Sequence, residues 1–345
     1  MQQTVRTKAD PGAAGWRIRD PVTRLRWWGD DRSFDLSESR RLLVGTASEC
    51  DLRLEVGASA SRIHASLEKT NEGWTIADLG SKNGTRQDGE DRASFLLAPG
   101  MEVELGRARL VAESAEVVTL REFLRRLIGW GKDTMGEVDR AFQAVRQMAH
   151  LRASLLVLGD GPIVGIARRI HRLVLGAERP FSAHARGEIG GAAVERARDG
   201  MVVFDAQHLP ADFAHVLATS RLPDWRVRLV MGATKGRAAA RVAAKIAALA
   251  TVTVPSLTKR REELDQVLLA YAHDAVASFG APGTGLRPQD LSWVRASGVK
   301  DHHEADEVMS RVVAVRNWGV SGGAARLGLT HGALSKYFLR RKIPT

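Results

Sequence analysis

The chain has 345 residues, of which 44% are hydrophobic and 26% charged, and it carries a formal net charge of +11. This is the composition of an ordinary globular protein with room for two or three domains, and the absence of repeats and low-complexity tracts excludes a solenoid or a fibrous chain. The positive charge favours an anionic partner such as nucleic acid or phosphate, although an Arg-rich proteome would give the same excess.

Cys50 is the single cysteine, so the chain forms no internal disulfide, and its apolar neighbours favour a packing role over a reactive thiol. The first residues contain no apolar run of signal-peptide length, and no window approaches 18 uninterrupted apolar residues. We therefore expect a cytoplasmic protein that makes no membrane contact. Residues 1–15 are small and polar, which predicts a disordered tail.

Residues 16–114 alternate between short apolar runs and turn residues, a texture that predicts an antiparallel β-sandwich. The predicted strands are 23–28, 41–44, 51–54, 63–68, 74–78, 101–105 and 107–111. Three predicted loops, 45–48, 59–64 and 80–85, are rich in hydroxyl, amide and cationic side chains. Such groups at one end of a rigid sandwich suit the recognition of a phosphorylated peptide.

The strings LLVGTASECDLRL, SRIHASL, GWTIADLGSKNGT and LAPGMEVELG resemble the forkhead-associated (FHA) family, in its order and spacing, over about residues 20–114. The resemblance implies a β-sandwich whose end loops bind phosphothreonine peptides. It implies that Ser61 hydrogen-bonds the phosphate, that Arg62 or Lys82 adds charge, and that Asn83 holds the peptide backbone. It also implies that His64 braces the loops.

The same resemblance implies that Gly45 and Gly84 have structural roles in the loops. This chain departs from the family pattern at one position, Thr46. The family's usual phosphate-binding Arg follows the first glycine, where this chain has Thr46. Replacing a guanidinium by a hydroxyl removes a charge-assisted hydrogen bond of about 1.5–3 kcal/mol. Two hypotheses remain open: a phosphopeptide site of reduced affinity, with Thr46 among its contacts, or an interaction domain that does not require phosphate.

After residue 114 the pattern changes to helices and buried strands. Residues 115–133 predict a linker helix, and helical spacing continues over 137–150. Apolar runs at 153–158, 201–204 and 227–231 alternate with helical stretches, which predicts a parallel α/β sheet within residues 134–300. Residues 256–296 predict mostly helices with a loop at 280–285.

This middle region resembles the AAA+ domain of sigma-54-dependent activators. LLVLGDG stands at the phosphate loop, GMVVFDAQHLP at the Walker B strand, VRLVMGAT at the sensor strand, and VPSLTKRREEL before the lid. The resemblance implies an α/β domain followed by a helical lid, with no metal or cofactor retained. An unrelated α/β domain is the alternative.

The residues that would bind and hydrolyse ATP are missing from these motifs. The phosphate loop lacks its Lys and its Mg²⁺-binding hydroxyl, and Pro162 removes an N–H from the cradle. Asp205 is followed by Ala206 instead of a second acid, and Lys235 stands at the sensor position. The segment between strands is too short for the family's GAFTGA loop. We therefore predict a pseudo-ATPase; a weak ATPase with a divergent loop is the alternative.

Three other groups of polar or charged residues are more typical of the protein surface than of a metal site or a nucleic-acid site. Asp160 and Asp205 are more typical of loop and strand-end acids than of a metal pair, and His302-His303-Glu304 does not place both rings on one helical face. A basic run extends from Lys235 to Arg261 and is more typical of a solvated helix face than of a nucleic-acid groove.

Residues 306–345 predict a helix-turn-helix. One helix covers 306–317, Ser321 caps a second (GGAARLGL), and Thr330 caps a third (HGALSKYFLRRK) after a tight turn. Residues 311–345 contain seven Lys or Arg and no acid.

NWGVSGGAARLGLTHGALSKYFLRRKI resembles the Fis-type DNA-binding domain, which implies a homodimer with its recognition helix in the major groove. Thr330, His331 and Ser335 would then face base edges. The phosphate contacts would be Lys336, Arg340, Arg341 and Lys342.

The sequence as a whole predicts a multidomain regulator without enzymatic activity: an FHA β-sandwich, a degenerate AAA+ domain with a helical lid, and an all-α helix-turn-helix. Its partners would be a phosphothreonine protein, such as a Ser/Thr kinase or its substrate, and DNA. The alternative is a phospho-dependent adaptor that does not bind DNA.

Overall fold

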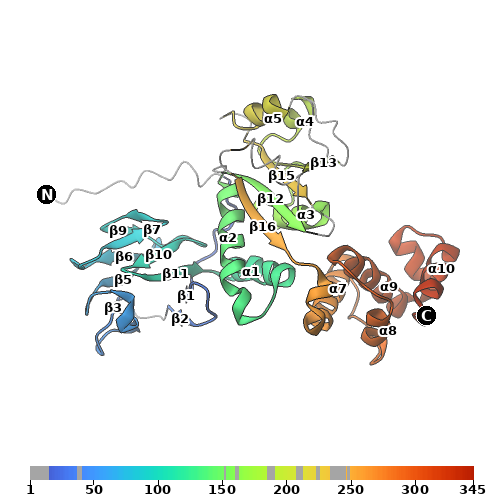
Figure 1. The fold of residues 1–345 in the computed structure, drawn as a ribbon, viewed down its shortest axis with the longest axis horizontal. Coiled ribbons are helices and arrows are strands. Elements are labelled where there is room, and N and C mark those ends of the chain that lie inside the picture. Colours follow the sequence, from blue (N-terminus) through green and yellow to red (C-terminus); the bar gives the residue numbers. More distant parts are fainter. Residues whose placement is uncertain are drawn as a thin grey trace.

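A computed structural model describes residues 15–36, 41–150, 153–159, 163–184, 191–206, 213–222, 226–233, 246 and 249–345. Nearly all of the predicted tail, 1–15, lies outside these residues. Three parts follow one another along the chain: an N-terminal β-sandwich, a central parallel sheet with helices, and C-terminal helices (Figure 1).

The β-sandwich consists of two sheets that pack around one apolar core. The first has the order β2-β1-β11-β10-β7-β8 and the second β4-β3-β5-β6-β9. The strands are β1 (Arg24–Trp27), β2 (Ser33–Asp35), β3 (Arg41–Gly45), β4 (Leu52–Arg53), β5 (Ala65–Thr70), β6 (Gly73–Asp78), β7 (Thr85–Gln87), β8 (Glu90–Asp91), β9 (Ser94–Leu96), β10 (Glu102–Leu105) and β11 (Ala108–Glu113). Apolar positions of the predicted strands, including Leu25, Val44, Leu67, Ile76 and Val103, are buried between the sheets. The β-sandwich prediction is thus confirmed.

The central part contains five parallel strands in the order β13-β14-β15-β12-β16. Its elements are α1 (Ala115–Ile128), α2 (Met135–Ala149), β12 (Ser154–Gly159), α3 (Ile163–Val174), β13 (Phe181–His184), α4 (Gly191–Arg196), β14 (Met201–Asp205), α5 (Phe213–Ser220), β15 (Arg228–Ala233) and β16 (Leu249–Val254). The sheet is parallel, as the alternation of strands and helices predicts.

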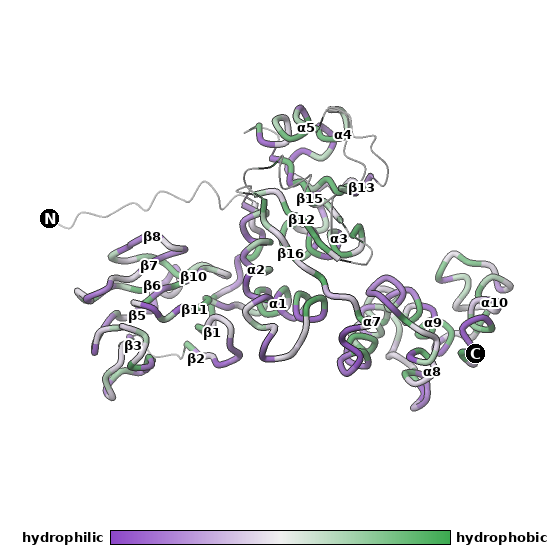
Figure 2. The backbone as a smooth tube through the Cα atoms, viewed as in Figure 1, coloured by the Kyte–Doolittle hydropathy of each residue, from purple (hydrophilic) through white to green (hydrophobic). Residues whose placement is uncertain are grey.

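The predicted linker helix is not a free-standing connector. Leu120, Leu124 and Leu127 of α1 are fully buried, and they share one apolar cluster with α2 and the central sheet. Trp16 and Ile18, which precede the sandwich, enter the same cluster. Figures 1 and 2 show α1 and α2 between the β-sandwich and the sheet. The sandwich therefore packs directly against α1 and α2, and the connection is not a free linker.

The C-terminal part is helical: α7 (Leu264–Phe279), α8 (Asp290–Ala296), α9 (His302–Leu327) and α10 (His331–Arg341). Gly319 within α9 has φ 65° and ψ 179°, so α9 is two helices joined at a kink. This break falls between the two predicted helices, 306–317 and the one after Ser321. Among the described residues, no helix is long and apolar enough to cross a membrane.

Candidate functional site

The three polar loops predicted from the sequence meet at one end of the sandwich. The amide N–H of Thr46 donates to the carbonyl of Ser61 at 3.1 Å, and that of Ala47 donates to the carbonyl of Arg62 at 3.0 Å. Gly45 makes this approach possible, since a Cβ there would clash with the Arg62 carbonyl oxygen. The first loop, 45–48, is therefore clamped onto the second, 59–64.

His64 joins the second loop to the third, 80–85. Its ring is fully buried; Nδ1 accepts from the Ser61 amide at 3.0 Å, and Nε2 lies 3.1 Å from the Gly84 carbonyl oxygen. Because Nδ1 accepts a hydrogen bond and a carbonyl can only accept one, the neutral tautomer with the proton on Nε2 satisfies both contacts. The imidazole thus acts as a brace, the role implied for His64 by the FHA resemblance.

Ser61 and Asn83 are brought together by reciprocal contacts between these loops. The Lys82 amide donates to the Ser61 Oγ at 3.0 Å, and the Asn83 Nδ2 donates to the Ser59 carbonyl at 2.6 Å. As an acceptor in the first contact, the Ser61 hydroxyl keeps its own proton for a ligand. The Asn83 amide keeps its oxygen and a second N–H. Both side chains can therefore bind a peptide without rearranging.

Asp78, which the sequence motifs did not single out, organises the third loop. Its carboxylate accepts from the Gly80 and Ser81 amides, both at 2.9 Å, and from the hydroxyls of Ser81 at 2.6 Å and Thr85 at 2.7 Å. Burial alone would raise the pKa of Asp78, but these hydrogen bonds hold it below its ordinary value. An Asp two residues before a Gly-Ser pair is the pattern of an Asx turn, and this signal is visible in the sequence.

The cations of the site are exposed. Lys82 is solvent-exposed, and the Arg62 side chain is 84% exposed with only a 3.9 Å contact to Glu49. Thr46 is half-buried beside them. A wide hollow of about 690 Å³ lies on one flank of Lys82, Asn83 and Gly84. The site therefore offers hydroxyls, amides and mobile positive charge to an anionic ligand.

Most residues selected for DNA contact lie on the surface of the last helix. Thr330 caps α10, its Oγ1 accepting from the Ala333 amide at 3.2 Å. The exposed residues are Thr330, His331, Lys336, Arg340 and Lys342, and Ser335 is half-buried.

Arg341 differs from the other candidate phosphate contacts. Its guanidinium lies 5.3 Å from the Tyr337 ring and 3.4 Å from the Ser297 Oγ, so it points into the helical domain. Helical periodicity from Leu334 and Phe338 places position 341 on the buried face of α10. The selection of Arg341 as a phosphate contact considered its charge and not this periodicity.

Several residues selected in the central domain, including Asp160, Pro162 and Lys235, lie outside the described residues. Among those described, Asp205 ends β14 and pairs in register with Gly232 of β15. The Ile163 side chain, at the start of α3, lies so close to Gly232 that a Cβ there would clash with it. The aliphatic side chain of Ile163 thus lies at the edge of the sheet where the parallel strands have their C-terminal ends. The described residues contain no group of three or more His, Cys, Asp or Glu that could hold a metal ion.

Comparison with known proteins finds similarities to parts of this chain. Residues 29–116 match the family model described as the cytoplasmic domain of an inner membrane component of the type III secretion system. Two curated relatives are oxoglutarate dehydrogenase inhibitors, from Corynebacterium diphtheriae (37% identical over 68 residues) and Corynebacterium jeikeium (30% over 76 residues). The matches cover 20% and 22% of this chain and 47% and 52% of the relatives. This chain therefore spans about half the length of each.

Solved FHA domains are also similar to part of this chain. One comes from a study of phosphothreonine-dependent FHA domain interactions, with 25% identity, a TM-score of 0.24, and coverage of 26% of this chain and 94% of that one. Another is the FHA domain of CT664 from Chlamydia trachomatis, with 27% identity, a TM-score of 0.24, and coverage of 26% and 95%. The N-terminal domain is a β-sandwich, followed further along the chain by a helical C-terminal region.

Proposed function

We propose that this chain is a non-catalytic transcription regulator that binds a phosphothreonine protein through its FHA-like domain and binds DNA, as a homodimer, through its last two helices. The observation that carries the proposal is the position of Ser61 and Asn83. Both are held by neighbouring loops and both retain hydrogen-bonding groups that face solvent.

The chemistry of the loops favours a phosphate dianion. The Ser61 hydroxyl donates, Lys82 and Arg62 supply positive charge, and Asn83 suits the backbone of an extended peptide. Thr46 supplies a hydroxyl where the family's Arg would stand, so affinity rests more heavily on Ser61. The order and spacing of the FHA motifs along the chain support the same ligand.

The experiment is a pull-down of a phosphothreonine peptide library with the full chain and two variants. Ser61→Ala and Asn83→Ala each remove a hydrogen bond to the ligand, and the bond to the charged phosphate is worth about 1.5–3 kcal/mol. We expect Ser61→Ala to weaken binding by roughly tenfold to a hundredfold. Ser94→Ala, on the exposed strand β9, is the matched control. Equal capture by wild type and Ser61→Ala would contradict the assigned role.

For the central domain we propose a scaffold that does not hydrolyse ATP. Ile166 and Ala206 stand where charged or hydroxyl groups would be needed, and both side chains are apolar and buried. The measurement is ATP turnover by the purified chain. Turnover above background that Asp205→Asn abolishes would show that the domain is an ATPase.

The exposed face of α10 supports the proposal of DNA binding. Lys336 and Arg340 lie about one turn apart on that face, and His331 is at the start of the helix beside the cap Thr330. A gel shift against genomic fragments in a salt series tests this, because each Lys or Arg on a phosphate contributes to the salt dependence. We expect Arg340→Ala to reduce the slope by about one and Arg341→Ala to leave it nearly unchanged. Absence of salt-dependent specific binding would favour the adaptor.

A further inference from the structure

A second hollow, of about 320 Å³, borders the β4–β5 loop, which also carries Ser61 of the candidate site. We call it the Trp–Arg hollow. Its principal side chains are Trp27, Trp28, Arg32, Glu55, Arg107 and Arg109. They come from the end of β1, the turn after it, the residue before the short helix at Val56–Ala58, the β10–β11 turn and the start of β11.

The Trp–Arg hollow and the candidate site share one backbone segment. The Asn83 Nδ2 holds the Ser59 carbonyl at 2.6 Å, while the Arg107 amide holds the preceding carbonyl, that of Ala58, at 2.7 Å. Gly106 packs against the same segment, where a Cβ would be 2.5 Å from the Ser59 oxygen. Since an extended residue spans about 3.3–3.6 Å, a peptide held at Asn83 would reach the hollow within a few residues.

The walls of the hollow combine flat aromatic rings with guanidinium groups. Arg109 lies 3.9 Å from the Trp28 ring centre and Arg32 lies 5.5 Å from that of Trp27. Both tryptophans are half-buried, so part of each ring remains accessible. Trp and Arg are the residue types most enriched among those that dominate binding energy at protein interfaces.

Three arginines and one carboxylate, that of Glu55, line the hollow. Arg109 pairs with Glu102, and Arg32 pairs with Asp30 at 2.6 Å and Glu55 at 2.9 Å. Arg107 is exposed, and no ion pair to it is found within the described parts of the chain. Its guanidinium is therefore the group best placed to meet a carboxylate from outside.

We propose that the partner's phosphothreonine segment extends into the Trp–Arg hollow and places an Asp or Glu side chain against Arg107. This inference rests on the proposed phosphothreonine function and specifies its ligand: a phosphopeptide with an acidic residue a few positions from the phosphothreonine. The Trp27 and Trp28 rings pack against the aliphatic part of that segment and exclude water from the ion pair.

The test is selection from a phosphothreonine peptide library that is randomised on both sides of the phosphothreonine. We expect wild type to enrich Asp or Glu at one flanking position, and Arg107→Glu to lose this enrichment while it keeps its preference for phosphorylated peptides. The selected acidic peptide should bind Arg107→Glu at least tenfold more weakly, and its neutral Asn or Gln counterpart should differ by less than twofold. Arg107→Lys should retain the enrichment.

Arg41→Glu, an exposed site at the start of β3, is the charge-matched control and should behave as wild type. Phosphate-dependent selection without acidic enrichment, or with enrichment that Arg107→Glu leaves unchanged, would overturn the inference while leaving the proposed function intact. No preference for phosphorylated peptides in wild type would contradict the proposed function and this inference together.

Discussion

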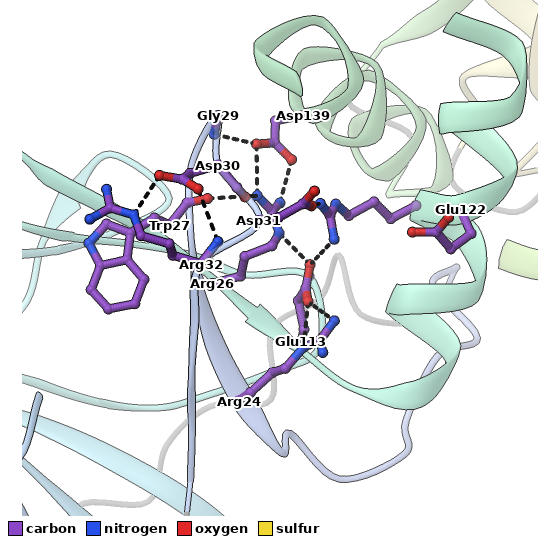
Figure 3. Close-up of polar contacts among 12 residues, drawn as sticks. Arg24, Arg26, Trp27, Gly29, Asp30, Asp31, Arg32, Glu113, Glu122 and Asp139 are labelled. Atoms are coloured by element: carbon purple, nitrogen blue, oxygen red, sulfur yellow. Dashed lines mark hydrogen bonds and ion pairs between the residues drawn. The ribbon is translucent and has the colours of Figure 1, made fainter. Parts of the chain in front are cut away.

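Arg26 is a buried cation at the junction between the sandwich and the helices. Its side chain is 2% exposed; Nε donates to Glu113 at 2.6 Å, and Nη1 donates to Asp139 of α2 at 3.1 Å (Figure 3). Burial alone would lower the pKa of Arg26, but Asp139 and Glu113 hold it above its ordinary value. Asp139 also accepts from the Gly29 amide at 2.6 Å. One carboxylate thus fixes both the buried cation and the β1–β2 turn.

We predict that Asp139→Ala destabilises the chain by about 3–5 kcal/mol, because it leaves the Arg26 charge buried with one partner fewer. Denaturant unfolding measures the effect. The control is Glu116→Ala, which breaks an exposed ion pair with Arg17 and should cost less than about 1 kcal/mol. A loss from Asp139→Ala as small as that of the control would show that Arg26 is satisfied without α2.

His302 makes stability depend on pH. Burial lowers the pKa of His302 to about 3, and its Nδ1 lies 3.2 Å from the Tyr271 hydroxyl. The folded state therefore holds His302 neutral while the unfolded state gains a proton below about 6.5. Stability should fall by about 1.4 kcal/mol per pH unit as pH decreases from about 6.5 towards about 3, and nothing is lost above that range.

Urea unfolding of wild type and His302→Gln at several pH values isolates this contribution. The difference in stability between the two proteins should shift in favour of the variant as pH falls, because only wild type must keep an imidazole uncharged. A difference that stays constant from pH 7 to pH 5 would contradict the predicted pH dependence.

At the scale of elements, α1 connects the sandwich to the C-terminal helices. Asp31, in the β1–β2 turn, pairs with Arg121 and with Arg125, the latter at 3.2 Å. In the last turn of α1, Arg260 donates to the carbonyls of residues 126 and 127 at 3.1 and 2.8 Å. Arg126 pairs with Asp274 of α7. The second half of the helix is thus held by charged contacts to the sandwich and to the C-terminal helices.

We predict that Arg260→Ala loosens the C-terminal end of α1 and the start of α7 without affecting the β-sandwich. The reason is that the last carbonyls of a helix lack intrahelical partners, and here a buried guanidinium satisfies two of them. Hydrogen exchange should quicken over residues 124–130 and 264–270. Arg295→Ala, which breaks a half-exposed pair with Asp265, is the control. Unchanged exchange in both segments would refute the connection through Arg260.

At the scale of the whole molecule, the sequence predicts the elements better than their assembly. Alternating or continuous apolar residues predict most of the long strands, and helical spacing predicts α1 and α2, because these patterns are local. The central strands β13 and β16 were not predicted. The strands β2, β7, β8 and β9 are not predicted, since two or three residues such as TRQ carry no period, and neighbouring strands alone hold them in place.

Contacts between distant residues could not be predicted either. Arg26 and Asp139 are 113 positions apart, so nothing local shows that one neutralises the other. The same holds for Arg260 and α1, which explains why the local pattern of α1 suggests only a linker. In the candidate site, Ser61, His64 and Asn83 were predicted from their motif. The Asx-turn pattern at Asp78 is also visible in the sequence, whereas its contacts and the contribution of the β10–β11 turn became visible only with the fold.

The central claim is that the loops around Ser61 and Asn83 recognise phosphothreonine, and calorimetric titration tests it most directly. A library-selected phosphothreonine peptide and its unphosphorylated twin are titrated into the full chain under identical buffer and salt. We predict at least tenfold tighter binding of the phosphorylated peptide, a ratio that Ser61→Ala reduces. Equal binding of the two peptides would contradict the claim.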